Sequence, residues 1–198
     1  MAKRKQCNDN DVVVVNGLRV IPEWITKEEE QRLIDAVNKE EYDAETLQRR
    51  TQQYGFQYRY KARTVTTKDR IGDGELPEWQ QSISERLRKE GIFPELPEQL
   101  IVNEYKPGQG IAAHVDAKVF AAPIVSLSLG SACTFRLEHP KKEKRVDLYV
   151  EPRTLIIMSG EARWDWKHSI PKRKKDNGIA RSTRISLTWR RLASASDK

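Results

Sequence analysis

The sequence of 198 residues is long enough to bury a sizeable core and predicts one globular domain over residues 1–198. Its 36 Lys and Arg against 29 Asp and Glu give a net charge of +7, which favours polyanionic partners but equally describes an ordinary solvated surface. Two cysteines exclude a disulfide framework and a thiolate zinc site, and no apolar run reaches the roughly 18 residues of a membrane span, so we expect a soluble, cytoplasmic monomer with no membrane partner.

Two helices are predicted in the first half of the chain. Thr26 followed by Glu29 forms a capping box, and the helix that begins there extends to about Lys39. Its buried face consists of Leu33, Ile34 and Val37. A second helix is expected from Pro77 to Gly91, because proline favours the first turn of a helix and glycine ends one. Its buried face consists of Trp79, Ile83 and Leu87.

Residues 49–63, between these helices, alternate aromatic with polar or basic side chains. If this segment is extended, Tyr54, Phe56, Tyr58 and Tyr60 share one face, and Arg59 and Lys61 share the other. Aromatic rings stack on nucleobases and basic side chains contact phosphates, so the pattern is typical of a surface that binds single-stranded nucleic acid. A half-buried strand whose aromatic face joins the core has the same alternation, so both interpretations stand.

From residue 99 onward the pattern changes to short strands separated by turn residues. The predicted strands are 99–105, 124–129, 133–138, 145–150, 154–158 and 183–190. Several short strands after two helices predict an α+β fold, with a double-stranded β-helix (jelly roll) core and the N-terminal helices packed on one face. The polar residues 1–11 and the tail after Leu192 are expected to be frayed.

Two of the three histidines are candidate metal ligands. His114 and Asp116 are two residues apart on an extended segment, so both can face the same ion. His168, much further along the chain, supplies a third ligand. Two imidazoles and one carboxylate leave coordination positions open, as iron(II) oxygenases require. His139 lies in a predicted turn without a partner and is expected to be exposed.

The strand 183–190 carries two arginines on its polar face. Alternation places Arg184, Ser186, Thr188 and Arg190 on that face, opposite three apolar residues. Arginine pairs bidentately with carboxylates, so this face is a candidate anchor for a dicarboxylate co-substrate. Six residues separate Arg184 from Arg190, or about 20 Å along an ideal strand, which favours Arg184 as the anchor. A solvated face on an edge strand is the alternative.

Strand 99–105 offers two further polar side chains immediately before the His114 segment. Asn103 and Tyr105 share a face, and each can donate a hydrogen bond to a carboxylate. A strand tyrosine is more often part of the packing, and only the position of Tyr105 favours a functional role.

The order, spacing and type of these residues resemble the AlkB-type dioxygenases, a family that couples oxidative decarboxylation of 2-oxoglutarate to hydroxylation of nucleic-acid bases. The match extends over about 99–190 and includes Asn103 to Tyr105, His114 to Asp116, Pro123 to Gly130, Ser159 to Arg163, His168 and Arg184 to Arg190. The resemblance implies an enzyme that uses Fe(II), 2-oxoglutarate and O2. It implies that His114, Asp116 and His168 bind iron.

The same resemblance implies that Asn103, Tyr105, Arg184 and Arg190 bind 2-oxoglutarate, and Ser186 on the same strand face joins this candidate set. It also gives Arg190 more weight than the strand geometry alone. Residues 12–98 would then form the N-terminal helices with a nucleotide-recognition lid, and 99–192 the catalytic core.

Substrate recognition is expected to involve the lid and the margins of the metal site. The candidates are Arg50, Tyr54, Tyr58, Lys118 and Arg163. Of two lysine-rich runs, 141–145 and 172–175, the second follows His168 closely and is the better candidate for phosphate contact.

Lys118 departs from the family pattern, because many DNA-repair members have an acidic residue two positions after the aspartate ligand. Residues 50–54 and 160–168 look more like the branch that acts on tRNA wobble uridines. We expect oxidative demethylation of alkylated bases in RNA or single-stranded DNA, and wobble-uridine hydroxylation stays open as the alternative. So do a protein or small-molecule hydroxylase on the same scaffold and a non-catalytic nucleic-acid-binding module.

Overall fold

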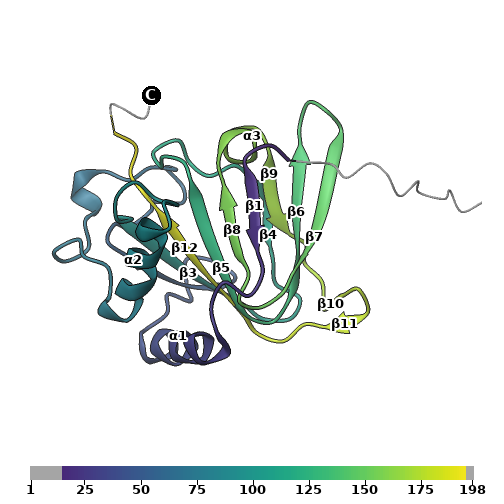
Figure 1. Cartoon of the computed structure of the whole chain (residues 1–198), viewed down its shortest axis with the longest axis horizontal. Helices are drawn as coiled ribbons and strands as arrows, with labels where there is room; N and C mark the ends of the chain where they lie inside the picture. Colours follow the sequence, from purple (N-terminus) through teal and green to yellow (C-terminus); the bar gives the residue numbers. More distant parts are fainter. Residues whose placement is uncertain (1–14, 195–198) are drawn as a thin grey trace, which may run out of the picture.

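Two antiparallel sheets face each other in the computed structural model, which describes residues 15–194 (Figure 1). The strands of the larger sheet, in spatial order, are β1 (Leu18–Ile21), β8 (Leu155–Met158), β5 (Ile124–Gly130), β12 (Arg184–Arg190), β3 (Gln99–Tyr105) and β2 (Arg50–Tyr54). Those of the smaller sheet are β4 (Ile111–His114), β9 (Lys167–Ile170), β6 (Cys133–His139) and β7 (Lys144–Val150). A short hairpin, β10 (Lys175–Asp176) and β11 (Ile179–Ala180), completes the strands. This is the predicted jelly roll.

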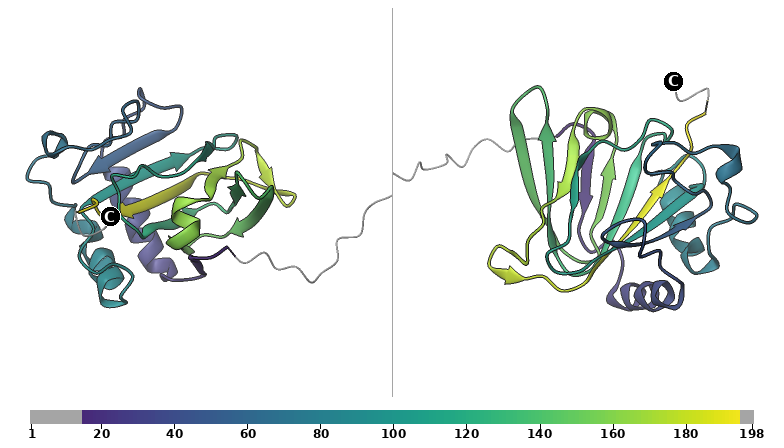
Figure 2. Two further views of the ribbon diagram at one scale, coloured as in Figure 1. Left: turned by 90° about the horizontal axis from the view of Figure 1, so that it is seen from above. Right: turned by 180° about the vertical axis from the view of Figure 1, so that it is seen from behind.

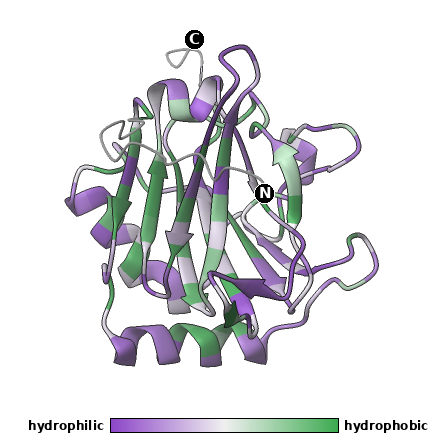
Figure 3. Ribbon diagram, turned by 90° about the vertical axis from the view of Figure 1, so that its right-hand side faces the viewer, coloured by the Kyte–Doolittle hydropathy of each residue, from purple (hydrophilic) through white to green (hydrophobic). Residues whose placement is uncertain are grey.

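Helices α1 (Lys27–Lys39) and α2 (Gln81–Lys89) cover the larger sheet on the side away from the smaller one (Figures 1 and 2). The short α3 (Gly160–Trp164) lies at the ends of the strands, away from this layer, and there are 3-10 turns at Thr67–Asp69 and Glu78–Gln80. The capping box at Thr26 is present, and hydrophilic and hydrophobic residues alternate along α1 (Figure 3). The helix predicted from Pro77 is a 3-10 turn followed by α2.

Two hydrophobic clusters lie on the two sides of the larger sheet. The first packs α1 and α2 against the sheet and contains Leu33, Val37, Ile83 and Leu87 together with Leu187 and Trp189 of β12. The second lies between the sheets and contains Phe120, Ile124, Phe135, Leu137, Ile156 and Trp166. Burial of these side chains is the main stabilising contribution to such a fold. The larger sheet is therefore a central layer with both faces covered.

The N-terminal half contributes more to the sheets than its sequence pattern indicated. It adds the edge strands β1 and β2, so residue 99 does not separate a helical part from a strand part. The aromatic segment is not one continuous strand, because β2 ends at Tyr54 and Gly55 has a positive φ of 76°. A Cβ on Gly55 would lie 2.0 Å from the carbonyl oxygen of Glu98, so only glycine fits this turn.

Of the segments expected to be frayed, residues 1–11 and 195–198 lie outside the described residues, whereas the backbone amide of Ala193 donates to the carbonyl oxygen of Val119 at 2.8 Å. No helix of residues 15–194 is both long and apolar enough to cross a membrane.

Candidate metal centre and adjoining cavity

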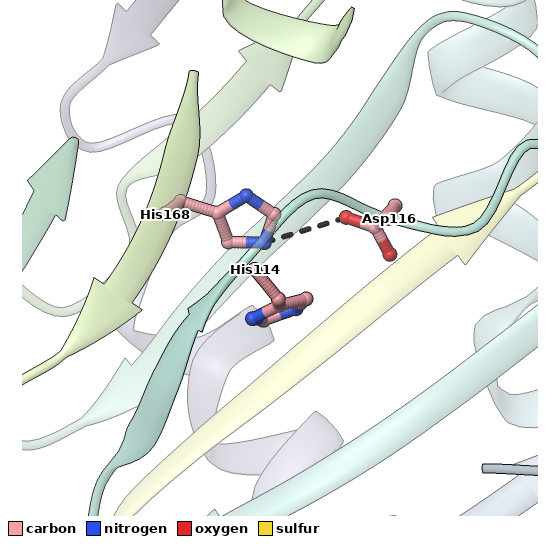
Figure 4. Close-up of side chains that lie close together, drawn as sticks. All are labelled: His114, Asp116 and His168. Atoms are coloured by element: carbon pink, nitrogen blue, oxygen red, sulfur yellow. Dashed lines mark ion pairs between the residues drawn. The ribbon is translucent and has the colours of Figure 1, made fainter. Parts of the chain in front are cut away.

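Two neighbouring strands of the smaller sheet bring the three predicted ligands together. His114 ends β4 and lies directly opposite His168 of β9, while Asp116 follows in the loop after β4 (Figure 4). The ligand atoms of the three side chains all lie within 4.8 Å of one another. The Nε2 atom of His168 is 3.3 Å from Oδ2 of Asp116. This cluster fits one metal ion with nitrogen and oxygen ligands.

Close packing of β4 against β9 fixes the register of the two histidines. A Cβ on Gly110, just before β4, would lie 2.1 Å from the carbonyl oxygen of Ile170, so the residue must be glycine for the strands to approach. The Nδ1 atom of His114 lies 2.8 Å from the carbonyl oxygen of Ala112 and donates to it, which leaves Nε2 for a metal. The ring of Phe135 stacks on His168 at 5.6 Å.

The protonation states of the triad suit a metal cation. Burial lowers the pKa of His168 to about 3 and also lowers the pKa of His114, so both imidazoles are neutral at physiological pH. Burial alone would raise the pKa of Asp116, but nearby positive charges, of which Arg190 contributes most, outweigh it and keep the pKa below its ordinary value. Neutral imidazole and ionised carboxylate are the forms that bind metals.

Two arginines fix the loop that carries Asp116. Arg190 of β12 forms an ion pair with the carboxylate, at 2.6 Å from Nη2 to Oδ1. Arg163, only 2 % exposed, donates to the carbonyl oxygens of Asp116, Ala117 and Phe120 at 3.1, 2.8 and 2.8 Å. Arg163 was predicted to bind substrate, and the structure instead places it inside the protein as a positioning residue for the ligand loop.

A polar stripe extends from this centre along the inner face of the larger sheet. Its members are Asn103 and Tyr105 of β3, Ser126 and Ser128 of β5, and Arg184, Ser186, Thr188 and Arg190 of β12. Ser186 Oγ lies 2.8 Å from Ser126 Oγ, and Arg184 Nε donates to Ser128 Oγ at 2.9 Å. The predicted candidates for 2-oxoglutarate binding therefore share one buried surface.

Arg184 is the member of this stripe whose charge is least satisfied. Its side chain is buried, and its Nη1 atom has no hydrogen-bond partner among residues 15–194. No carboxylate of those residues forms an ion pair with it, and its guanidinium lies 5.5 Å from the Tyr105 ring centre. A buried guanidinium without a counter-charge is costly unless an anion binds there. The polar stripe therefore fits a small dicarboxylate such as 2-oxoglutarate, and the triad fits iron(II).

A cavity of about 440 Å³ opens beside the triad and is lined by His114, Asp116, Arg190 and Asn103. Tyr58 and Tyr60 form part of its wall, and Tyr58 packs against Phe120 at 5.6 Å between ring centres. Basic side chains contribute much of the rest, namely Arg49, Arg63, Arg190 and Lys172. Asp116 is the only carboxylate among the lining residues, so the cavity is strongly cationic away from the metal ligands.

The predicted lid residues are divided between the two sides of the larger sheet. Tyr58 lines the cavity, and its contact with substrate stays a prediction. Arg50 instead forms an ion pair with Glu104 at 2.6 Å, and Tyr54 packs edge-on against Trp79 at 6.0 Å on the helix side. Both predictions of substrate contact are therefore corrected. The reason is strand alternation, since Arg50 and Tyr54 point away from the face that carries Asn103.

Arg49, Tyr60 and Arg63 were missed as cavity residues. Arg49 is adjacent to Arg50, and its Nε donates to Asn103 Oδ1 at 2.7 Å. Tyr60 and Arg63 belong to the same aromatic and basic segment, so the signal was present but the face could not be assigned. Lys172 confirms that the run 172–175 begins at the cavity, whereas Lys118 is exposed and lines a different cavity.

His139 is not the exposed turn residue that its sequence predicted. It ends β6, is buried, and its Nδ1 accepts hydrogen bonds from the backbone amides of Lys141 and Lys142, both at 3.1 Å. Its ring packs edge-on against Trp166 at 5.3 Å. It is a structural histidine and takes no part in the triad.

The sequence matches the 2OG-Fe(II) oxygenase superfamily over residues 17–190. It is 40 % identical over 167 residues to the tRNA (carboxymethyluridine(34)-5-O)-methyltransferase ALKBH8 of Mus musculus, a match that covers 81 % of this chain and 25 % of the mouse protein. It is also 36 % identical over 186 residues to an uncharacterized protein of Acanthamoeba polyphaga mimivirus, covering 90 % and 86 % of the two chains. The chain thus spans about a quarter of the mouse relative's length.

Among solved structures, the fold is similar to that of OsALKBH1, with a TM-score of 0.67 and 17 % sequence identity. The similarity covers 90 % of this chain and 99 % of the other. At this level of identity the agreement concerns the fold alone.

Proposed function

Because the chain belongs to the 2OG-Fe(II) oxygenase superfamily, and within it to the AlkB-type dioxygenases, we propose that it oxidises a base of single-stranded nucleic acid. Its cofactors are those of the family, Fe(II), 2-oxoglutarate and O2. The cationic, tyrosine-lined cavity beside the His114, Asp116 and His168 triad is the observation that carries the choice of substrate class.

The roles of the individual residues follow from where they lie. His114, Asp116 and His168 bind iron(II), and Arg163 keeps the Asp116 loop in place through its three hydrogen bonds to backbone carbonyls. Arg184 pairs with a carboxylate of 2-oxoglutarate, and this contact supplies the counter-charge that the buried guanidinium lacks. Once bound, the metal and 2-oxoglutarate supply the activation of O2 for oxidation of a substrate C–H bond.

The polar hydroxyl and amide groups of the stripe orient the co-substrate. Asn103, Tyr105 and Ser186 lie on the same face as Arg184, and each has a side-chain donor. Arg190, which belongs to the stripe, forms an ion pair with Asp116 and so connects the stripe to the metal ligands. Closely placed donors of this kind hold a small ligand in one orientation.

A nucleic-acid base fits the cavity for two reasons. Tyr58 and Tyr60 offer aromatic surfaces that can stack on a base of any sequence. Arg49, Arg63 and Lys172 surround the opening with positive charge that attracts phosphates. A protein or small-molecule hydroxylase would need neither feature.

The charge of the cavity also bears on which base is oxidised. Adenine and cytosine that are methylated on a Watson–Crick ring nitrogen carry a positive charge, which the four cations of the lining disfavour. A neutral or carboxylate-bearing base suits this lining better. The similarity to a mouse protein named for tRNA carboxymethyluridine also favours hydroxylation of a uridine side chain in tRNA over demethylation.

Product analysis by mass spectrometry tests this function. The enzyme is incubated with iron(II), 2-oxoglutarate and either methylated oligonucleotides or tRNA, and the His114→Ala variant serves as the control. Gain of one oxygen on a tRNA uridine supports hydroxylation, and loss of a methyl group as formaldehyde supports demethylation. If neither substrate changes while 2-oxoglutarate is consumed without added substrate, the nucleic-acid assignment fails but the dioxygenase survives.

Two further measurements separate the rival classes. Consumption of 2-oxoglutarate that is lost in His114→Ala eliminates a non-catalytic binding module. Oligonucleotide binding that weakens steeply as salt increases supports a phosphate-binding surface, whereas weak binding that is insensitive to salt favours a protein or small-molecule substrate.

A further inference from the structure

We propose that a second cavity, on the other side of the Asp116 loop, binds a nucleotide that flanks the oxidised base, with the flanking base stacked on Trp164 and its phosphate between Arg63 and Lys118. The cavity has a volume of about 430 Å³ and is lined by Arg63, Val115, Asp116, Ala117, Lys118 and Trp164. This site rests on the proposed function, because it extends the path of a single strand beyond the cavity that receives the target base.

The two cavities adjoin. Arg63, Val115, Asp116 and Ala117 line both of them, so one short loop with one arginine forms their common wall. The Arg63 guanidinium donates to the carbonyl oxygen of Val115 at 2.9 Å, which places a positive charge at the boundary between the cavities. A strand with one base in the first cavity therefore passes its adjacent phosphate close to Arg63.

Trp164 is an exposed aromatic residue, and a neighbouring side chain holds one face of its ring. Its side chain is 41 % exposed at the end of α3. The guanidinium carbon of Arg163 lies 4.0 Å from the centre of its ring, a cation–π contact that covers one face. Arg163 is itself held by the carbonyl oxygens of the Asp116 loop. The indole is thus held at the metal loop with its remaining surface open, which is the arrangement of a base-stacking platform.

The charges around Trp164 favour a polyanion. Lys118 and Arg63 are both exposed, and Asp116, the one carboxylate of the lining, is buried and paired with Arg190. An aromatic ring that shares a cavity with two exposed cations matches a nucleotide, which offers a π face and a phosphate together. An apolar or acidic peptide would match only one of these features.

The position of Lys118 gives this residue a role that its sequence environment left open. It lies in the second cavity and does not line the first one. It therefore contacts the neighbouring phosphate instead of selecting the target base. This placement predicts that Lys118 affects affinity for a strand without altering which base is oxidised.

Binding of probes of two lengths tests the site. The probes are uridine monophosphate, which can fill only one cavity, and a fluorescent single-stranded RNA of about ten nucleotides. Trp164→Ala is expected to weaken binding of the longer probe about 5- to 150-fold and to leave that of the mononucleotide within about twofold. Trp164→Phe restores most of the loss because it keeps an aromatic face.

Two control variants remove the same kind of side chain, aromatic or basic, at positions outside both cavities. Tyr149 on β7 is 37 % exposed and lines neither cavity, so Tyr149→Ala is expected to leave both probes unchanged. Lys118→Ala lowers the slope of log affinity against log salt by about one unit, and Lys89→Ala, at the exposed end of α2, does not. Consumption of 2-oxoglutarate without substrate checks that the metal centre of each variant is intact.

The failures of this site and of the proposed function are distinguishable. If wild-type protein binds the RNA in a salt-dependent way and Trp164→Ala binds it equally well, the second site is overturned and the proposed function stands. An equal loss in Trp164→Ala and Tyr149→Ala also overturns the site, since it indicates a general surface effect. Absence of salt-dependent binding by wild-type protein overturns both.

Discussion

The two faces of β12 are equally buried and chemically opposite. Ile185, Leu187 and Trp189 pack against the helices in a hydrophobic cluster, where Trp189 Nε1 also donates to Gln80 Oε1 at 2.9 Å. Arg184, Ser186 and Thr188 are buried at 4, 5 and 9 % exposure against the inner faces of β3 and β5. Buried apolar side chains stabilise the fold, whereas buried polar groups cost free energy unless they find partners. One face therefore serves stability, and the other is maintained for binding.

Burial alone does not identify a binding residue, and the partners that a buried charge has without ligand are more informative. Arg184 donates to the hydroxyl of Ser128 and its Nη1 atom has no partner, whereas Arg163 on another element donates to three backbone carbonyls, although its Nε atom has no partner either. The first is arranged to receive a ligand, and the second is arranged to support a loop. Mutations on the two faces should consequently separate effects on ligand affinity from effects on folding.

The largest effect is expected for His114→Ala at the metal centre beside the polar stripe. Loss of groups that only orient a metal ligand costs about 10- to 100-fold in metal affinity, so removal of a ligand itself should cost more than about 100-fold. This loss is measured as iron(II) binding under anaerobic conditions and as consumption of 2-oxoglutarate. His139→Ala is the matched control and should retain both activities, because His139 bonds only to its own turn. Retention of iron binding in His114→Ala would remove this residue from the ligand set.

The apolar face is tested by Leu187→Ala, which deletes a fully buried side chain from the helix-side cluster. The expected loss is about 2–5 kcal/mol in the free energy of unfolding, because the lost contacts leave a cavity. Urea unfolding measures the loss. Ser186→Ala, one residue away on the other face, should cost about 1 kcal/mol or less. If Leu187→Ala weakened 2-oxoglutarate binding by the protein that remains folded, the two faces would not be independent.

Arg184→Met addresses the polar face directly. Hydrogen bonds to a charged partner contribute about 1.5–3 kcal/mol, so the Kd for 2-oxoglutarate should increase about 10- to 150-fold. The free energy of unfolding without ligand should stay the same or increase, since a buried charge without a carboxylate is removed. Calorimetric titration and urea unfolding give the two values. Arg184→Lys should be intermediate, because a lysine keeps the charge but not the planar fork. Unchanged affinity in Arg184→Met would assign the co-substrate to another residue.

Much of this contrast could be predicted from the sequence. Period-two alternation on 183–190 identified both faces of β12, and strand 99–105 was predicted with its observed bounds. Spacing and residue type made His114, Asp116 and His168 candidate ligands, the resemblance to the AlkB-type dioxygenases implied their role, and the structure brings them together. Local pattern sufficed in these places because one strand or one motif carries the information.

The sequence could not show toward which part of the fold the side chains of isolated or short segments point. Arg50 and Tyr54 are on the helix side because β2 pairs with β3, a contact between residues far apart in the chain. Arg163 was predicted to bind substrate because nothing local indicates that the Asp116 loop offers it three carbonyls. Gly55 ends β2 through its close approach to Glu98, which is also a distant contact. Tertiary pairing, and not propensity, decided each of these positions.

The smallest expected effect is for Asp176, a buried carboxylate that has several hydrogen-bond donors around it. Asp176 accepts hydrogen bonds from Thr134 and Arg173, both at 2.6 Å, and it also pairs with Arg181. Burial alone would raise the pKa of Asp176, but hydrogen bonds from Arg181, Thr134 and Arg173 outweigh it and lower the pKa to about 2. The folded pKa thus lies below the unfolded value, so the stabilisation is fully present above about pH 4 and is lost as pH falls through about 2.

Asp176→Asn should therefore reduce the free energy of unfolding by about 2 kcal/mol at neutral pH, with the difference from wild type shrinking as the pH falls below about 4. Urea midpoints measured from neutral pH towards pH 3 test this dependence. Affinity for 2-oxoglutarate should not change at neutral pH, because Asp176 does not belong to the polar stripe. A constant difference at all pH values would mean that the carboxylate charge contributes nothing. The arginines around Asp176 would then gain as little from their carboxylate as Arg184 gains in the protein without ligand, and an ion pair would not be what makes a buried arginine a structural residue.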